Sequence, residues 1–350
     1  MKKVYHAILC SAAAAVILGV VLFCSGVVPV SAMSYAMRPE EPSEALRALS
    51  LSLPSLPSLP SQKEDLAGET APTGTLSIPL FSKQNYAVFV PSAPQGANVI
   101  TKKTYASSLS VNNNSPTEID VNELLAKIPD LDLSAEGPQI LIVHTHTSES
   151  YNETGQNWYT DNDIRTADNS RNMVHMGNIL EEELTRRGYN VIHCQKRHDE
   201  DFNQSYTLSN ITVREYLEKY PSIAVVIDLH RDSLIDAAGT KYRPVTEING
   251  ESVAQIMLLM GVGNSTYPHP TWEENMSLAL RIQQQGNLLY PGLMRPILVR
   301  PSRYNQYLSK GAVLVELGAC GNTPAEAEAA ARIFGEICAK ALDQIRKEQS

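Results

Sequence analysis

The stretch QILIVHTHTSES, residues 139–150, shows how this chain folds and where its chemistry lies. Residues 140–143, ILIV, form an apolar run of strand length, and polar residues follow at once. Two later stretches repeat this pattern, IAVVIDLHRDS at residues 223–233 and AVLVELGACGN at residues 312–322. Between them, apolar β-type runs alternate with amphipathic helical stretches, which is typical of a sheet with helices on both faces. The sequence therefore predicts an α/β fold with an open, mostly parallel sheet.

The same patterns predict the individual strands and helices. Strands are expected at residues 139–143, 189–194, 223–228, 253–259, 297–300 and 312–317, and helices at residues 172–187, 211–219, 273–289 and 324–345. Thr323 before Pro324 is a predicted N-cap followed by a proline in the first turn. In open sheets, ligands bind beyond the carboxyl ends of the strands, so the polar residues that follow the apolar runs mark the candidate site.

The N-terminal segment is predicted to be a membrane anchor. Lys2 and Lys3 precede an almost uncharged run that ends near residue 32, long enough to cross a hydrocarbon core that needs about 20 helical residues. We predict a single-pass transmembrane segment at residues 1–33, with everything downstream outside the cytoplasmic membrane. Cleavage of a signal peptide near Ala32 is the alternative.

Three further segments are predicted after the anchor. Residues 34–76 contain LSLPSLPSLPS and form a Pro/Ser-rich linker of extended, polyproline-like structure. Residues 77–136 form a small prelude with a helical stretch at residues 119–128. Residues 137–350 form the catalytic domain, since they hold the alternating strands and helices.

Charge and cysteine usage narrow the class of protein. The formal net charge of −9 over 350 residues argues against a nucleic-acid partner, because phosphate neutralisation needs clustered Lys and Arg. Cys194, Cys320 and Cys338 lie in or beside apolar runs without CxxC spacing. We therefore predict buried thiols in the core rather than a disulfide framework.

Polar residues at the ends of three predicted strands predict a metal site. His146 and Glu149 form an H-x-x-E pair after the first strand, His230 follows the third, and Glu316 ends the last. A hydrolytic Zn²⁺ takes about three N or O ligands and keeps one position for water. We predict that His146, Glu149 and His230 bind Zn²⁺. Glu316 is predicted to take a proton from the zinc-bound water and pass it to the leaving amine.

Other histidines remain alternative ligands. His144 precedes His146 by two residues, so in an extended segment both side chains point to the same face. His198 lies in the loop after the second strand and is a second alternative. His175 lies within the first long helix, where a structural role is the simpler interpretation. A single histidine at a strand end is more often a hydrogen-bonded structural residue than a ligand, so the prediction depends on the whole set.

Two residues near His230 have predicted supporting roles. Arg231 is expected to contact a substrate carboxylate or the developing oxyanion, with a salt bridge to Asp232 or Glu149 as the alternative. Asp228 is expected either to orient a histidine or to end the strand. The Gly- and Pro-rich run GVGNSTYPHP, residues 261–270, is expected to form a loop over the site.

Several of these stretches resemble a known family. VHTHTSESY, RHDE, SYTLSN, IDLHRDS, GVGN and VELGACGN resemble stage II sporulation protein P, over about residues 140–341. That family is similar to zinc amidases of peptidoglycan and, more distantly, to zinc carboxypeptidases. The resemblance implies an N-acetylmuramoyl-L-alanine amidase with endopeptidase activity on cross-links, which acts during engulfment of the forespore. The location implied is between the mother cell and forespore membranes, and the partners implied are stage II sporulation proteins D and M.

The resemblance leaves one ligand and the reaction open. Zinc amidases take their glutamate ligand from the start of the following helix, but here that start carries Asn172 and His175 and no Glu. This favours Glu149 and leaves His175 or His198 as substitutes. A carboxypeptidase-like wall peptidase and an inactive wall-binding module are the alternative functions.

Overall fold

The computed structural model describes residues 97–103, 109–159 and 164–350. The predicted anchor at residues 1–33 and linker at residues 34–76 lie outside these ranges, as does the first part of the predicted prelude. Among the described residues, no helix combines the length and apolar character needed to span a membrane.

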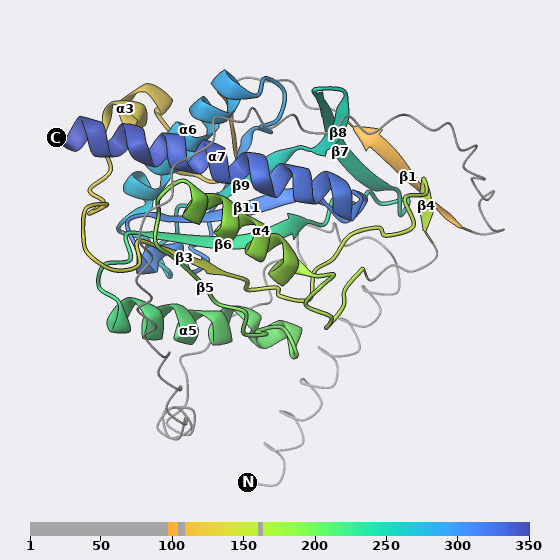
Figure 1. Ribbon diagram of the computed structural model, residues 1–350, viewed down its shortest axis with the longest axis horizontal. Helices are drawn as coiled ribbons and strands as arrows, with labels where there is room; N and C mark the ends of the chain where they lie inside the picture. The colour runs from red at the N-terminus through yellow and green to blue at the C-terminus, as the bar shows by residue number, and fades with distance from the viewer. Residues whose placement is uncertain (1–96, 104–108, 160–163) are drawn as a thin grey trace, which may run out of the picture. The chain divides into compact units, whose positions relative to one another are not determined.

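A seven-stranded sheet forms the centre of the fold (Figure 1). In spatial order its strands are β2 (Val111–Asn113), β10 (Ile297–Arg300), β9 (Ile256–Gly261), β11 (Ala312–Ala319), β6 (Val225–Asp232), β3 (Ile140–Val143) and β5 (Val191–His193). β11, β6, β3 and β5 are parallel, and so are β9, β10 and β2, but β9 pairs antiparallel with β11. The predicted α/β class is confirmed, and the sheet is mixed.

Helices cover both faces of this sheet, as predicted. α4 (Met173–Arg186), α6 (Trp272–Leu289) and α7 (Pro324–Gln349) lie on one face, and α5 (Ser205–Lys219) lies on the other (Figure 1). Alternate strand residues face opposite sides. Ile140 and Ile142 of β3 belong to the core under α4 and α7, whereas Leu141 and Val143 pack toward α5.

The helix ends follow the capping signals of the sequence. Asn172 caps α4 through its side chain, which accepts a hydrogen bond from Val174 N. Thr323 and Glu326 form a capping box at the start of α7, with Pro324 in the first turn. α5 begins six residues before its predicted start at residue 211. Its buried residues include Ser205, Ser209 and Thr212, so hydrophobic periodicity does not reveal its first turns.

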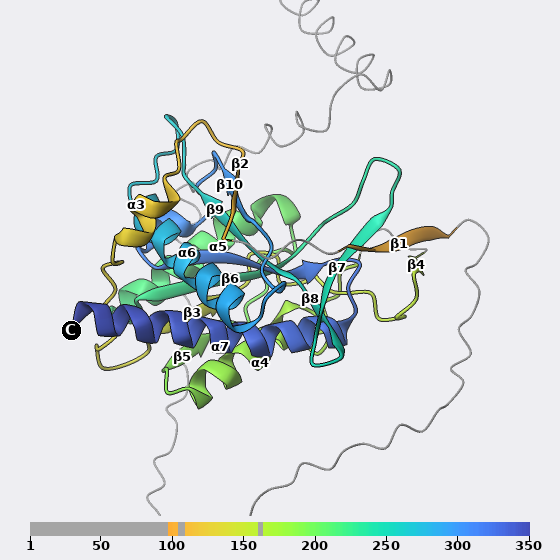
Figure 2. The ribbon, with the colours of Figure 1, turned by 90° about the horizontal axis from the view of Figure 1, so that it is seen from above.

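A second, four-stranded sheet lies beside the main one (Figure 2). Its order is β4 (Trp158–Tyr159), β1 (Asn98–Lys103), β7 (Lys241–Ile248) and β8 (Glu251–Ala254). Asn249 and Gly250 join β7 to β8 with φ angles of 53° and 81°, as a tight hairpin turn requires. The single strand predicted at residues 253–259 is therefore two strands, β8 and β9, which meet at Gln255.

Segments of the predicted prelude contribute to the described fold. β2 pairs in parallel with β10 at the edge of the main sheet. α3 (Val121–Ala126) lies within the predicted helical stretch, and Ser277 of α6 donates a hydrogen bond to Lys127 O just after it. The division of the chain into prelude and catalytic domain stays a prediction.

Candidate functional site

The carboxyl ends of β3, β6 and β11 meet at one edge of the sheet, because these strands are parallel and adjacent. Glu316 is the direct partner of His230 in the β11–β6 register, and Val143 is the partner of Asp228 in the β3–β6 register. Partnered residues point to the same face of a sheet, and Val226 and Ala312 of the same alternation pack toward α5. Asp228, His230 and Glu316 therefore point to the face that α5 covers.

His230 lies between two carboxylates. Its Nδ1 is 3.4 Å from Glu149 Oε2, and its Nε2 is 2.9 Å from Asp228 Oδ1. Asp228 also accepts hydrogen bonds from Thr145 N at 2.9 Å and Thr145 Oγ1 at 2.7 Å, which fix its carboxylate. Burial opposes the charge on His230, but Asp228 and Glu149 together raise its pKa well above the ordinary value. Asp228 thus has the contacts of a residue that orients His230.

His146 borders the same space from the loop after β3. Its ring stacks on Phe202 with centroids 4.6 Å apart and stands edge-on to His230 at 5.4 Å and to Tyr206 at 5.6 Å. Burial lowers the pKa of His146 to about 4, so the ring is neutral near pH 7. A neutral imidazole is the form that binds a metal ion.

Glu316 is a buried carboxyl group with an unused oxygen. Its Oε2 has no hydrogen-bond partner among the described residues. Burial, followed by the charge of Asp232, raises the pKa of Glu316 to about 8. A strongly perturbed carboxyl group at a strand end is typical of general acid–base residues.

β11 is irregular just beyond Glu316, where Gly318 adopts φ 65° and an added Cβ would lie 2.6 Å from Asn322 Oδ1.

These side chains fit a zinc ion in chemical type. His146 Nδ1 and Glu316 Oε2 are buried atoms that make no hydrogen bond within the described ranges. Glu149 Oε2 and His230 Nδ1, 3.4 Å apart, have the separation of two donors that share a tetrahedral ion with bonds of about 2.1 Å. However, no group of three or more His, Cys, Asp or Glu donors in the described part of the chain is already arranged to hold a metal ion.

Two arginines hold the loop that carries His146 and Glu149. Arg231 donates to Ser150 O and Ile164 O, both at 3.0 Å, and its backbone N donates to Glu149 Oε2. Arg165 lies 3.3 Å from Glu149 Oε1 and 3.2 Å from an oxygen of Asp199. Burial would raise the pKa of Glu149, but Arg231 and His230 hold it well below the ordinary value. The contact between Arg231 and Glu149 matches the alternative interpretation of Arg231, and its contact with substrate stays a prediction.

The alternative histidines have other partners. His144 Nδ1 is 3.0 Å from Leu229 O, and its Nε2 is 2.7 Å from His193 Nε2. His198 is bonded through both ring nitrogens, to His144 O and to Thr212 Oγ1. His175 pairs with Glu328 of α7 at 3.0 Å on the outer face. The structure therefore brings together His146, Glu149, His230 and Glu316, and it leaves these three histidines out of the cluster.

Comparison with known protein families identifies the family of this chain. Residues 69–339 match the family "Stage II sporulation protein P (SpoIIP)". The chain belongs to this family. One curated relative is stage II sporulation protein P of Bacillus subtilis (strain 168), 26% identical over 227 residues, which cover 60% of this chain and 54% of the relative. The chain thus spans about half the length of the curated relative that it matches.

Solved structures offer only a distant likeness. N-acetylmuramoyl-L-alanine amidase AmiC2 of Nostoc punctiforme is 10% identical with a TM-score of 0.34. The match covers 61% of this chain and 99% of the AmiC2 chain. N-acetylmuramoyl-L-alanine amidase from Clostridium difficile 630 is 12% identical with a TM-score of 0.34, and also covers 61% and 99%. Similarity at this level says nothing about the activity of the SpoIIP-family chain.

Sequence reasoning missed the aromatic side chains that border the site of this SpoIIP-family chain. Phe202 and Tyr206 precede and begin α5, and Tyr304 lies in the loop after β10, 5.8 Å from Tyr206 between ring centroids. Phe202 and Tyr206 do not follow any of the predicted strands. The stretch SYTLSN, which contains Tyr206, was the available signal through the family resemblance. Tyr304 carried no local signal, because a loop from the opposite end of the sheet brings it near.

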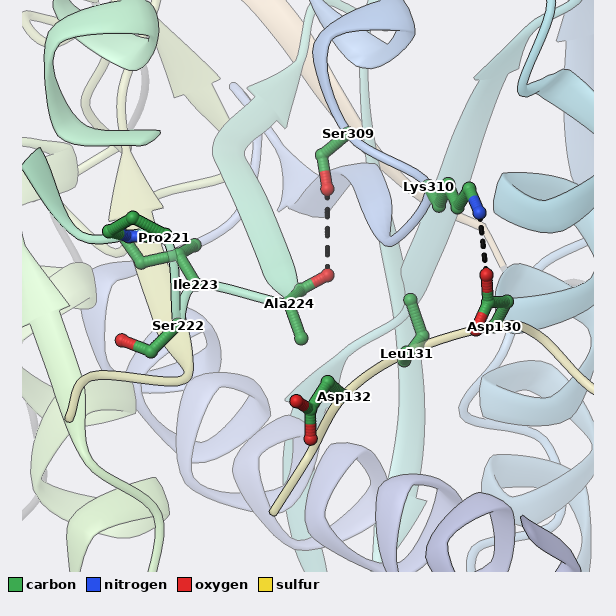
Figure 3. A pocket seen from close by; sticks show the side chains of 9 residues that line it. All are labelled: Asp130, Leu131, Asp132, Pro221, Ser222, Ile223, Ala224, Ser309 and Lys310. Carbon is green, nitrogen blue, oxygen red and sulfur yellow. Dashed lines mark hydrogen bonds and ion pairs between the residues drawn. The ribbon is translucent and has the colours of Figure 1, made fainter. Parts of the chain in front are cut away.

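Two other features lie at the opposite end of the sheet. The run at residues 261–270 follows β9, which is antiparallel to β11, so this loop begins away from Glu316 rather than over the site. Figure 3 shows a pocket beside Ala224 and Lys310, near the starts of β6 and β11. Its lining residues include no histidine, and Lys310 pairs there with Asp130 at 2.6 Å. The pocket does not contribute to the candidate site. The run at residues 261–270 packs against the segment just before Tyr304, since Gly263 N donates to Ser302 O at 3.0 Å.

Proposed function

We propose that the protein is a zinc-dependent peptidoglycan hydrolase of sporulation, which cleaves the amide between N-acetylmuramic acid and the L-alanine of the stem peptide. The observation that carries this proposal is the convergence of His146, Glu149, His230 and Glu316 at adjoining strand ends on one face of the sheet. Membership of the SpoIIP family supports the same substrate and process.

The metal ligands in this proposal are His146, Glu149 and His230, with Asp228 orienting His230 through the opposite ring nitrogen. Bound zinc would polarise the amide carbonyl and acidify a bound water. His144, His198 and His175 are not part of this set, because the partners of their ring nitrogens lie outside the cluster.

Glu316 moves the proton in the proposed reaction. As a carboxylate it accepts a proton from water, whose oxygen then bonds to the amide carbon. Glu316 then gives that proton to the amide nitrogen as the carbon–nitrogen bond breaks. The raised pKa suits both steps, because a group with a pKa near the working pH can accept and release a proton.

The cellular setting is also a proposal. An N-terminal anchor at residues 1–33 would hold the enzyme in the cytoplasmic membrane, with the catalytic part in the space between mother cell and forespore membranes. Endopeptidase action on cross-links and cooperation with stage II sporulation proteins D and M belong to the same proposal. The net charge of −9 is consistent with a partner that is not a nucleic acid.

Digestion of purified peptidoglycan by the purified full-length protein tests this function. The expected products, identified by mass, are glycan strands without stems together with whole free stem peptides. Release of only a terminal residue would support a carboxypeptidase instead. Binding to the wall without any product, by protein that contains zinc, would identify an inactive wall-binding module.

A further inference from the structure

The first turn of α5 places an aromatic side chain against the candidate site. The ring of Tyr206 stands edge-on to His146, with centroids 5.6 Å apart and planes at 86°. Its other neighbour is Tyr304, at 5.8 Å. Both tyrosines are only partly buried. Tyr206 therefore borders the space in which a substrate amide would meet His146 and Glu316.

The hydroxyl of Tyr206 has no partner within the described part of the chain. Apart from the backbone bonds of the helix, Tyr206 makes hydrogen bonds to described residues only through its backbone oxygen. That oxygen accepts from Ser209 Oγ and Asn305 Nδ2. Tyrosine hydroxyls in the interior usually have an acceptor. In this chain Tyr151 donates to Leu317 O at 2.9 Å, and Tyr189 donates to Asp343 at 2.8 Å. Those two tyrosines are buried, whereas Tyr206 is partly exposed, so its hydroxyl is available to a group that enters the site.

A strained loop packs against Tyr206. Tyr304 adopts φ 47°, a left-handed backbone conformation that is costly for a bulky residue and is found mostly where neighbouring contacts enforce it. Asn305 supplies such contacts, since its Nδ2 donates to Tyr206 O at 3.2 Å and to Ser209 Oγ at 2.8 Å. Asn210 donates in turn to Asn305 Oδ1 at 2.8 Å. The loop and the first turns of α5 are therefore locked together.

An ion pair connects these hydrogen bonds to His230. Thr145 Oγ1 lies 2.8 Å from Ser209 Oγ and 2.7 Å from Asp228 Oδ2, and Asp228 Oδ1 lies 2.9 Å from His230 Nε2. The start of α5 is thus held in a fixed relation to the ends of β3 and β6. A donor carried by that turn is pre-organised relative to His230, which favours a role in the reaction rather than in loose packing.

We propose that the hydroxyl of Tyr206 donates a hydrogen bond to the carbonyl oxygen of the scissile amide and stabilises its negative charge in the tetrahedral intermediate, given the proposed amidase function. When the water oxygen bonds to the carbonyl carbon, the carbonyl electron pair moves to this oxygen, where Tyr206 contacts it. When the carbon–nitrogen bond breaks, the pair returns and the hydrogen bond weakens. Tyr206 keeps its own proton throughout.

The test compares Tyr206→Phe with Tyr220→Phe, which removes a hydroxyl just after the other end of α5. Both full-length proteins are assayed on a soluble muropeptide, with zinc content and circular dichroism measured in parallel. Removing one oxyanion donor commonly lowers kcat by about 10² to 10³-fold. Tyr206→Phe should show such a loss with KM and zinc content unchanged, and Tyr220→Phe should match wild type.

A phosphinate analogue of the muramoyl–alanine amide gives a readout that needs no turnover, because it resembles the tetrahedral intermediate. Tyr206→Phe should bind it about 10²-fold more weakly than wild type does, with substrate affinity retained.

Three outcomes would overturn the inference. If Tyr206→Phe keeps the wild-type kcat while Glu316→Gln is inactive, the proposed function stands and Tyr206 is not the donor. If Tyr206→Phe loses zinc, the side chain supports His146 instead of substrate. If wild-type protein binds no zinc and cleaves no muropeptide, the proposed function fails, and this inference fails with it.

Discussion

Two buried glutamates ten residues apart have opposite surroundings. Glu326, in the first turn of α7, accepts from Arg243 Nε at 2.8 Å, Ser252 Oγ at 2.6 Å, Asn322 Nδ2 at 3.0 Å and its own cap residue. Burial opposes its charge, but these partners hold its pKa below the ordinary value. Glu316, in β11, has an oxygen without a partner in the described residues, and its pKa is raised to about 8.

The difference separates a stabilising group from a reactive one. A buried carboxylate whose oxygens are all bonded joins elements together, and here it ties β7 and β8 to α7. A buried carboxyl group with an unused oxygen costs folding free energy, and proteins retain such groups mainly at functional sites.

Replacing the proposed ligands should give the largest effect. His146→Ala and His230→Ala are each expected to lose zinc and activity together, because removing one of about three protein ligands exposes the ion to solvent and chelators. Metal analysis after purification without chelator, together with wall digestion, measures both. A variant that keeps full activity and metal would remove that residue from the ligand set.

Glu316→Gln should leave the metal and the fold in place but stop turnover. The amide has nearly the same size and cannot accept the proton, so activity on wall fragments should fall by about 10² to 10⁴-fold. The thermal midpoint should not fall, since no bonded charge is lost. Loss of zinc in this variant would instead make Glu316 a ligand.

Glu326→Gln should show the opposite pattern. It leaves the Arg243 side chain, which is 12% exposed, without its charged partner, and breaking a buried ion pair commonly costs about 3 kcal/mol or more. Urea unfolding should report that loss, while kcat of the protein that remains folded stays near wild type. Equal stability of wild type and Glu326→Gln would show that the ion pair and hydrogen bonds of Glu326 do not anchor α7.

The stabilisation by Glu326 should depend on pH in one direction. Because its pKa is lower in the folded protein, its contribution is present above the unfolded value of about 4.3 and is lost as the pH falls through the folded value. The difference in unfolding free energy between wild type and Glu326→Gln should therefore be constant from pH 6 to 8 and shrink below about pH 4. A constant difference down to pH 3 would contradict the ion-pair explanation.

His175→Ala should have the smallest effect. His175 makes a partly exposed pair with Glu328 on the outer face, and such pairs contribute about 0 to 1 kcal/mol. Zinc content and activity should equal those of wild type, which also makes this variant the control for the two ligand variants. A loss of metal would return His175 to the ligand set.

The sequence by itself determined the elements whose signals are local. Continuous apolar runs predicted strands such as β3 and β6, and Thr323 and Pro324 predicted the start of α7. It also placed His230 and Glu316 at strand ends, and parallel pairing then made them direct partners. These features depend on neighbours within a few residues, or on the rule that adjacent parallel strands end at the same edge of a sheet.

Only the tertiary structure decided which polar side chains are already bonded. The sequence left His198 open as an alternative ligand, but Thr212 and His144 O contact both of its ring nitrogens. Because β9 is antiparallel to β11, the loop that was expected over the site begins at the other end of the sheet. The loop after β10 nevertheless brings Tyr304 to Tyr206. Such contacts join residues far apart in the chain, so they depend on how the strands pair and pack, which no local pattern records.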